Sequence, residues 1–339
     1  MALHTRLIGI AATAMMLAAC SSPASSGSAS PSPVGGVVGA IQVPDLPGAA
    51  AAGFGSLWVS DYKHGSLVRV SGSTRLSLTR IRVGDPGALQ PACQPDQEDA
   101  PAGSFIIRRC DLPSGVACGA GSVWTGRNDL KAVVRIDPAT NRITATIPVG
   151  ILTFGLAATG DAVWVTSNDD NVVIRIDPRT NRVVARVPVP SGPAGVLITP
   201  TAVWVADSTG RLLTKIDPAT NAVQAEVPVE ASPFPMALAA GSLWVRNEDA
   251  STLSRVDPSA ARVTASIKTD PFYTTEGLDS LVGASSGVWM SGLRLQFLDA
   301  TTQKVTRSLP VEGRPYDAGG GRLWVLGTTG QVSLLDPAA

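Results

Sequence analysis

Polar residues that could bind a ligand or a metal ion recur at one place in this sequence, two to six residues after its tryptophans. Carboxylate and amide oxygens are ligands that Ca²⁺ takes, and with arginine they could also hold a polar molecule. Solvated hairpin turns use the same residue types, because Asp and Asn suit turn geometry. The set comprises Asp61, His64, Arg127, Asn128, Asn168, Asp169, Asp207, Arg246, Asn247 and Glu248.

Motifs that would point to a particular catalytic chemistry are missing. The chain has two histidines, His4 and His64, so a histidine cluster is excluded. Residues 283–287 match G-x-S-x-G, but they form the turn before Trp289 and no histidine can be assigned to them. Neither a phosphate-cradling glycine loop nor an EF-hand spacing is present. The polar residues therefore indicate a binding face and leave its chemistry open.

The elements that must position these residues are set by seven tryptophans. They stand 66, 40, 40, 40, 45 and 35 residues apart, and three spacings of 40 indicate a repeat of propeller-blade length. Each lies in a short apolar strand that follows a turn. The runs are apolar on both faces, as expected for a sheet covered on both sides. We therefore expect these tryptophans in the core: Trp58, Trp124, Trp164, Trp204, Trp244, Trp289 and Trp324.

Asp-Pro follows four of the tryptophans at a distance of 13 residues, and it recurs at Asp336. A strand such as VVIRI precedes it, and a turn such as Pro-Arg-Thr-Asn and a third strand follow. Asp can cap its own backbone, Pro presets φ, and Asn tolerates the left-handed conformation. With an inner strand before each Trp, every repeat has four antiparallel strands. The sequence predicts an all-β, seven-bladed β-propeller.

The first and last strands of the folded region, residues 37–339, are complementary. The last repeat stops after its third strand, whereas Val37–Val43 has the pattern of an outer fourth strand. We expect this N-terminal strand to pair in the last blade and to close the ring, which removes the open edge.

The repeated unit RIDP-x-TN-x-V, seen at 175–183, resembles the YVTN/YncE-like seven-bladed β-propellers, which are similar to the streptogramin-lyase propellers. The resemblance covers about 300 residues. Streptogramin-lyase-like catalysis implies a His-centred metal site, which a single histidine in the folded region does not supply. A lactonase-like propeller uses Glu, Asn and Asp around one divalent ion, and the types that suit it here are Glu248, Asn128, Asn168 and Asp207. A shared propeller fold does not by itself specify an activity.

Two insertions break the regular repeat. Residues 84–113 add about 26 residues between two blades, and a second extra segment at 269–279 carries Tyr273 and Glu276. Connections between blades reach the same face as the turns after each Trp, so both insertions should border the mouth of the channel, unless they are decorative loops. Arg314 and Tyr316 begin an inner strand facing this site.

Cysteines can oxidise outside the membrane, and three pairings of Cys93, Cys110 and Cys118 exist. Cys118 lies six residues before Trp124, at a buried inner-strand position, and is expected to be a packed thiol. That leaves Cys93–Cys110 as the predicted bridge, which would pin the first insertion; a bond from Cys110 to Cys118 would contradict this.

The N-terminus predicts a lipoprotein signal peptide over residues 1–19. Its apolar run of 13 residues is too short to span a membrane, and it ends in Leu-Ala-Ala-Cys20, which looks like a bacterial lipobox. Residues 20–36 are then a lipidated Cys20 and a flexible Ser/Pro/Gly tether. We expect attachment to the cell membrane by this lipid, on the extracytoplasmic side.

The net charge of zero limits the classes of partner that the sequence predicts. Lys plus Arg and Asp plus Glu both number 27, and no basic stripe exists, so nucleic-acid binding is not expected. The sequence favours a monomeric envelope propeller that binds a small polar ligand or an envelope protein. The alternative is a divalent-metal-dependent lyase or hydrolase at the channel mouth, with Ca²⁺ or another divalent ion as cofactor.

Overall fold

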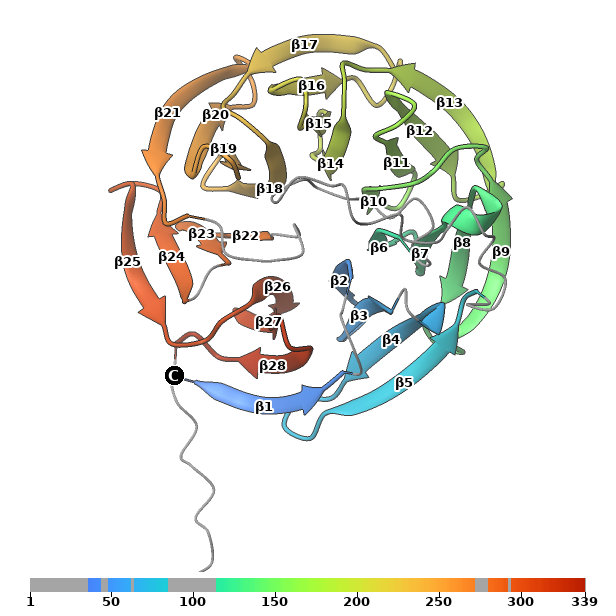
Figure 1. Ribbon diagram of the computed structural model, residues 1–339, viewed down its shortest axis with the longest axis horizontal. Helices are drawn as coiled ribbons and strands as arrows, with labels where there is room; N and C mark the ends of the chain where they lie inside the picture. The colour runs from blue at the N-terminus through green and yellow to red at the C-terminus, as the bar shows by residue number, and fades with distance from the viewer. Residues whose placement is uncertain are drawn as a thin grey trace, which may run out of the picture. The chain divides into compact units, whose positions relative to one another are not determined.

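Seven four-stranded antiparallel sheets are arranged as blades around a centre (Figure 1). The computed structural model describes residues 36–43, 48–61, 64–84, 114–271, 280–291 and 294–338. In every blade the innermost strand comes first and the tryptophan-bearing strand second. Two further strands follow outward. The predicted all-β, seven-bladed propeller is confirmed.

The strands follow one another around the ring in chain order, four to a blade. Blade 1 has β2 (Ala50–Gly53), β3 (Ser56–Asp61), β4 (Ser66–Ser71) and β5 (Ser77–Arg82). Blade 2 has β6 (Val116–Gly119), β7 (Ser122–Arg127), β8 (Ala132–Asp137) and β9 (Arg142–Pro148). Blade 3 has β10 (Leu156–Ala158), β11 (Val163–Ser167), β12 (Val172–Asp177) and β13 (Arg182–Pro188). Blade 4 has β14 (Pro193–Ile198), β15 (Val203–Asp207), β16 (Leu212–Ile216) and β17 (Val223–Pro228).

Blade 5 has β18 (Pro233–Ala239), β19 (Ser242–Asn247), β20 (Thr252–Asp257) and β21 (Arg262–Lys268). Blade 6 has β22 (Leu281–Ala284), β23 (Gly287–Met290), β24 (Leu295–Asp299) and β25 (Lys304–Leu309). Blade 7 has β26 (Arg314–Gly319), β27 (Arg322–Leu326), β28 (Gln331–Leu335) and, as its outer strand, β1 (Val37–Gln42).

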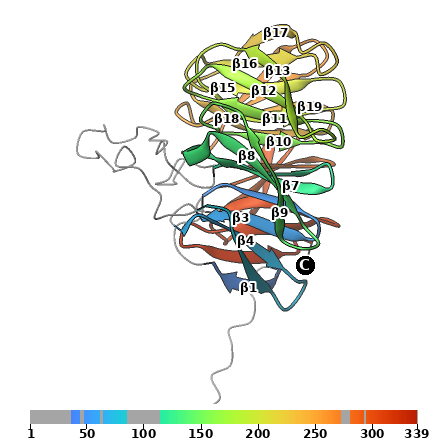
Figure 2. The same cartoon turned by 90° about the vertical axis from the view of Figure 1, so that its right-hand side faces the viewer.

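The last blade takes its outer strand from the beginning of the folded region. Strand β1 pairs antiparallel with β28, with Ile41 opposite Val332. The amide of Asp336 donates to the carbonyl of Gly36 over 2.8 Å, so the two ends of the described chain lie side by side (Figures 1 and 2). The predicted closure by an N-terminal strand is confirmed.

Tryptophans fill the junctions between blades. Five of the seven are fully buried, and Trp289 and Trp324 are 5% and 3% exposed. Trp58 packs with Val116 and Val123 of the following blade, and Trp204 with Leu243 and Val245. These large side chains pack with buried Val, Leu and Ile residues on both faces of the sheets, and this apolar burial holds the ring together.

An arginine or lysine of the third strand links each of blades 1 to 5 to the blade that follows it. Arg175 lies 5.5 Å from the ring of its own Trp164 and donates to the carbonyl of Pro218 over 2.5 Å. It also donates to Asn221 Oδ1 over 3.0 Å. We call this contact a latch. Its donors in blades 1 to 5 are Arg69, Arg135, Arg175, Lys215 and Arg255.

The latch is missing from the last two junctions. In blade 6 the residue opposite Trp289 is Phe297, whose ring centroid lies 5.0 Å from that of the tryptophan. In blade 7 Leu334 lies opposite Trp324. Other arginines serve these junctions: Arg307 of β25 donates to the carbonyl of Pro337 in blade 7 over 3.3 Å, and Arg314 of blade 7 donates to the carbonyl of Gly48 before blade 1.

Turn chemistry follows the sequence prediction. Asn141, Asn181 and Asn221 have φ between 54° and 60°, in the left-handed region. Asp137 accepts a hydrogen bond from the amide of Ala139, which holds the pKa of that carboxyl below its usual value. Within the described ranges, no helix is long and apolar enough to span a membrane; Asn128–Leu130 forms a single 3₁₀ turn.

Candidate rim site

The turns between the second and third strands share one face of the ring with the connections between blades, because successive strands of a blade are antiparallel. Ten of the fourteen predicted binding residues lie on this face, five at the ends of the second strands and five in the turns that follow them. We call it the loop face. Their side chains alternate along the strand, so neighbouring residues point into different junctions.

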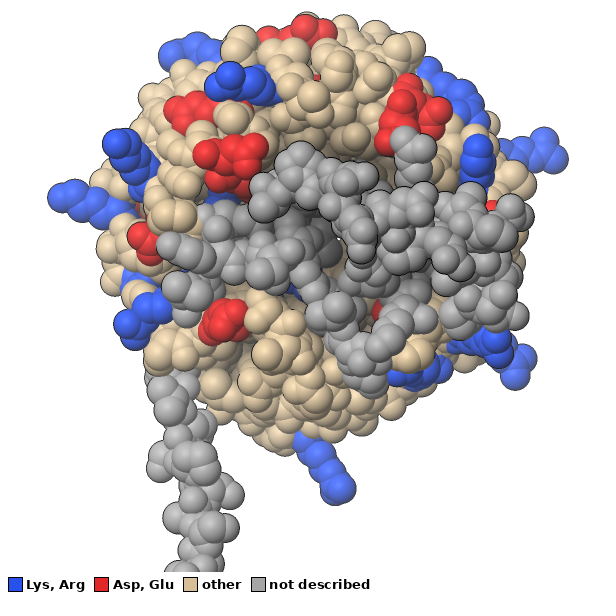
Figure 3. Space-filling model, in the orientation of Figure 1, with Lys and Arg blue, Asp and Glu red and all other residues tan. Residues whose placement is uncertain are grey.

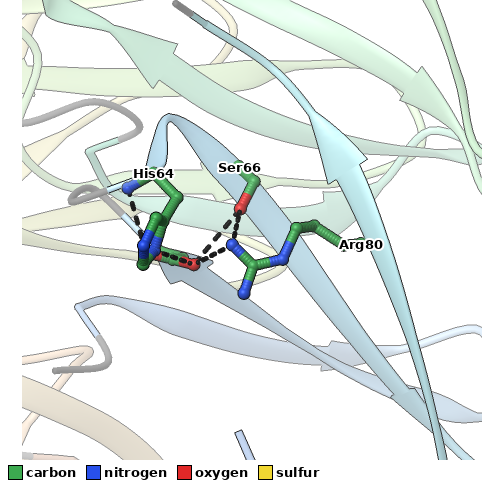
Figure 4. Close-up of polar contacts among 4 residues, drawn as sticks. His64, Ser66 and Arg80 are labelled. Carbon is green, nitrogen blue, oxygen red and sulfur yellow. Dashed lines mark hydrogen bonds and ion pairs between the residues drawn. The ribbon is translucent and has the colours of Figure 1, made fainter. Parts of the chain in front are cut away.

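Asp61 is the centre of a polar cluster on blade 1, whose other members, His64, Ser66 and Arg80, are labelled in Figure 4. Its carboxylate is buried and lies 2.7 Å from Arg80 Nη1. It also contacts Nδ1 of His64 at 2.9 Å and accepts a hydrogen bond from the Ser66 hydroxyl at 3.3 Å. A buried carboxylate needs such partners, and this one takes a cation from β5. The cluster ties His64 to β4 and β5, the outer strands of its own blade.

Arg127 fastens the base of the first insertion. It forms two contacts with Asp129, at 2.9 and 2.5 Å, and donates to the carbonyl of Val83 over 2.7 Å. Val83 directly precedes the segment 84–113 in the chain. The neighbouring Asn128 is buried, and its amide donates to and accepts from Thr153. Both predicted ligand-binding residues therefore bind backbone of adjacent connections.

Arg246 and Arg314 make the same kind of contact elsewhere on the ring. Arg246 is 2% exposed and donates to the carbonyls of Ser291, at 2.8 Å, and of Asp270, at 3.3 Å. Asp270 stands at the base of the second insertion. Arg314 donates to the carbonyl of Gly48 over 2.9 Å and so joins the last blade to the first. An arginine thus holds the base of each insertion.

Asp207 is a buried carboxyl at the end of β15. One oxygen accepts a hydrogen bond from the Thr214 hydroxyl over 2.5 Å, and the other, Oδ1, has no partner among the described residues. Burial raises the pKa of this carboxyl to about 7; the Thr214 hydrogen bond lowers it, and the nearby Glu226 carboxylate raises it. This position corresponds to Asp61, but it has no arginine partner.

Asn247 holds the equivalent position in blade 5 and is also fully buried. Its amide nitrogen donates to Thr252 Oγ1 and Ser254 Oγ, whereas its Oδ1 has no partner within the described chain. Thr252 donates in turn to Glu230. Two adjacent blades therefore each present a buried oxygen that lacks a donor.

The remaining predicted residues are more dispersed. Asn168 is half-buried and Asp169 is exposed in the turn of blade 3, Glu248 is half-buried in that of blade 5, and Tyr316 packs between blades 7 and 1. Cys118 is a half-buried free thiol on β6, and burial raises its pKa to about 12. Cys20, Cys93, Cys110, Tyr273 and Glu276 lie outside the described residues.

The described side chains do not converge on one point. No group of three or more His, Cys, Asp or Glu in this part of the chain could hold a metal ion. Sequence reasoning missed Arg80 and Glu226, the outer-strand residues beside Asp61 and Asp207. Both stand 22 residues after their Trp, so the repeat register was a signal that could have found them.

No protein-family model matches the sequence, and no curated protein matches it significantly. Solved structures do match its fold. A streptogramin B lyase structure is 12% identical, covering 87% of this chain and 95% of that chain, with a TM-score of 0.65. Virginiamycin B lyase from Staphylococcus aureus is 13% identical, covering 87% and 98%, with a TM-score of 0.66. Hydrazine synthase from Kuenenia stuttgartiensis is 14% identical, covering 67% and 77%, with a TM-score of 0.56.

This likeness is one of fold. Proteins with unrelated activities share the propeller, and identities of 12–14% carry no residue roles across. The resemblance to streptogramin-lyase propellers inferred from the repeat is supported at the level of architecture.

Proposed function

We propose that the protein is a lipid-anchored, extracytoplasmic propeller whose loop face binds a polar ligand or a protein partner at the cell envelope. The proposal rests on the contacts of the polar residues on that face, which bind the backbone of the connections between blades. Arg127 and Arg246 hold the base of each insertion, and Asn128 and Arg314 fasten neighbouring connections. Such contacts make a rigid platform for loops, which is the usual basis of a binding surface.

The anchor part of the proposal rests on the N-terminal sequence. Small residues precede Cys20 directly, and an uncharged Ser/Pro/Gly tether follows it. Replacing the thiol removes the acceptor for the lipid. We expect the Cys20→Ala variant to leave the membrane fraction, and its retention there would contradict the anchor.

The metal-dependent lyase or hydrolase alternative needs a set of ligands that the described residues do not bring together. Stoichiometric divalent ion in purified protein would favour this alternative over the binding module.

Site-directed photo-cross-linking in intact cells tests the binding face. A p-benzoylphenylalanine placed at Thr209, which is exposed on the loop face, should form a defined adduct. The same group at Gly160 is the matched control, because this position lies in open space at the opposite end of its blade. Adducts from both positions, or from neither, would contradict a partner bound at the loop face.

A further inference from the structure

The carboxylates of the loop face differ in what partners them. On blades 1 and 2, Asp61 pairs with Arg80 and Asp129 with Arg127. From blade 3 to the connection into blade 6, five others accept hydrogen bonds from hydroxyl or amide groups. We call these five the carboxylate arc: Asp170 accepts from Ser167, Asp207 from Thr214, Glu230 from Thr252 and Ser266, Asp249 from Ser232, and Asp270 from Gln296.

Neutral donors hold a carboxylate in place without cancelling its charge. Hydrogen bonds from Ser266 and Thr252 lower the pKa of Glu230, so this group stays ionised. Asp170, Asp249 and Asp270 are exposed.

Figure 3 shows most of the acidic side chains of this face over the blades built from β10–β21, while Lys and Arg project mainly from the outer edge. Within the described turns and connections of blades 3 to 5, Arg211 is the single Lys or Arg. This sector therefore keeps a negative field.

Two buried acceptors beneath these turns give independent evidence for a missing donor. Asp207 and Asn247 are the last residues of β15 and β19, and both are 0% exposed. The Thr252 proton goes to Glu230, so Thr252 Oγ1 must accept from the Asn247 amide nitrogen. This fixes Asn247 Oδ1 as the orphaned atom. Unpaired buried acceptors are costly, and each marks a place where a donor is expected.

We propose that the carboxylate arc is the docking surface for a basic segment of a partner protein. Its ammonium or guanidinium groups supply hydrogen-bond donors and add positive charge to a sector whose described turns and connections carry only Arg211. The inference rests on the proposed binding function and names the class of its partner. The exposed Asp170 and Asp249 make the first contacts, and donors that enter between the turns meet Asn247 Oδ1 and the ionised form of Asp207. Attraction of this kind weakens as salt screens it.

Fluorescence anisotropy with a labelled octalysine peptide and the full chain tests the proposal. Replacing both Asp170→Asn and Asp249→Asn should weaken binding about two- to thirtyfold at low salt, as expected for two exposed charge contacts. The charge-matched control is Asp161→Asn with Asp317→Asn: both residues are exposed, Asp161 in the turn between β10 and β11 and Asp317 towards the end of β26, on the side opposite the loop face. It should bind as the wild type does. Unchanged melting temperatures verify that both variants fold.

Three results would overturn the docking surface: no binding of octalysine to the wild type, equal weakening in both double variants, or equal binding of an octaglutamate peptide. If one of these results is found but the cross-linked adduct from Thr209 still forms, the binding function stands and only the basic partner is refuted. Loss of that adduct would refute the binding function itself.

Discussion

Replacing Arg135 by methionine should lower the melting temperature by roughly 3–6 °C, because it removes one latch between blades 2 and 3. Arg135 donates to the carbonyl of Pro178 over 2.6 Å and to Asn181 Oδ1 over 3.1 Å, and it lies 5.0 Å from the Trp124 ring. Hydrogen bonds from a charged donor contribute about 1.5–3 kcal/mol each when buried, and a cation over an aromatic ring about 0.5–2 kcal/mol. Methionine keeps most of the side-chain volume.

Arg135 is half-buried, and this partial exposure reduces the sum of the three contributions. We therefore expect the free energy of unfolding to fall by about 2–4 kcal/mol, which in a domain of this size corresponds to the melting-temperature shift given above. Differential scanning calorimetry measures it. Arg142→Met is the matched control, because this arginine is exposed at the start of β9, and its loss should stay within about 0.5 kcal/mol.

The Arg135→Lys variant keeps the positive charge but removes the forked guanidinium group, so it separates the contributions of the two. Blade 4 already uses Lys215, which donates to the carbonyl of Pro258 over 2.9 Å. The lysine variant should therefore lose about half as much stability as the methionine variant. Equal losses for Arg135→Met and Arg142→Met would refute the latch, and equal losses for lysine and methionine would refute the role of the charge.

Two further predictions concern a buried carboxyl and the closing strand. The raised pKa of Asp207 means that the folded protein holds a proton between about pH 4 and pH 7 that the unfolded chain has released, so stability falls as pH rises through this window. Asp207→Asn should remove this dependence and stabilise the protein at pH 8 by up to roughly 4 kcal/mol; a melting-temperature difference that is the same at pH 5 and pH 8 would contradict it. Deleting residues 34–43 should sharply lower the melting temperature, because β28 loses its partner, whereas deleting 22–31 from the tether should not; equal values would refute the closure.

The architecture could be predicted because its determinants are local and repeated. One buried tryptophan per blade gives the spacing, and the Asp-Pro and Asn residues specify turns through their own backbone preferences. Even the fourth strand of the last blade could be found, because the final repeat is one strand short.

The site could not be predicted to the same depth, because side-chain direction changes with every residue of a strand. Arg246 and Asn247 are adjacent in the sequence, yet Arg246 reaches Ser291 of the next blade and Asn247 contacts Ser254 of its own. Partners such as Arg80 and Glu226 stand on the outer strand, far along the chain from the residues they neighbour. A list of polar residues after each tryptophan does not contain this information.

All five latches point the same way along the chain, from each blade to the one made after it. A growing chain therefore completes each of these junctions only when the following repeat has been made, and β1 pairs only after β28, the last strand of the ring in chain order. The ring is assembled in one direction and sealed at the end, so a chain cut short anywhere before β28 keeps an open edge.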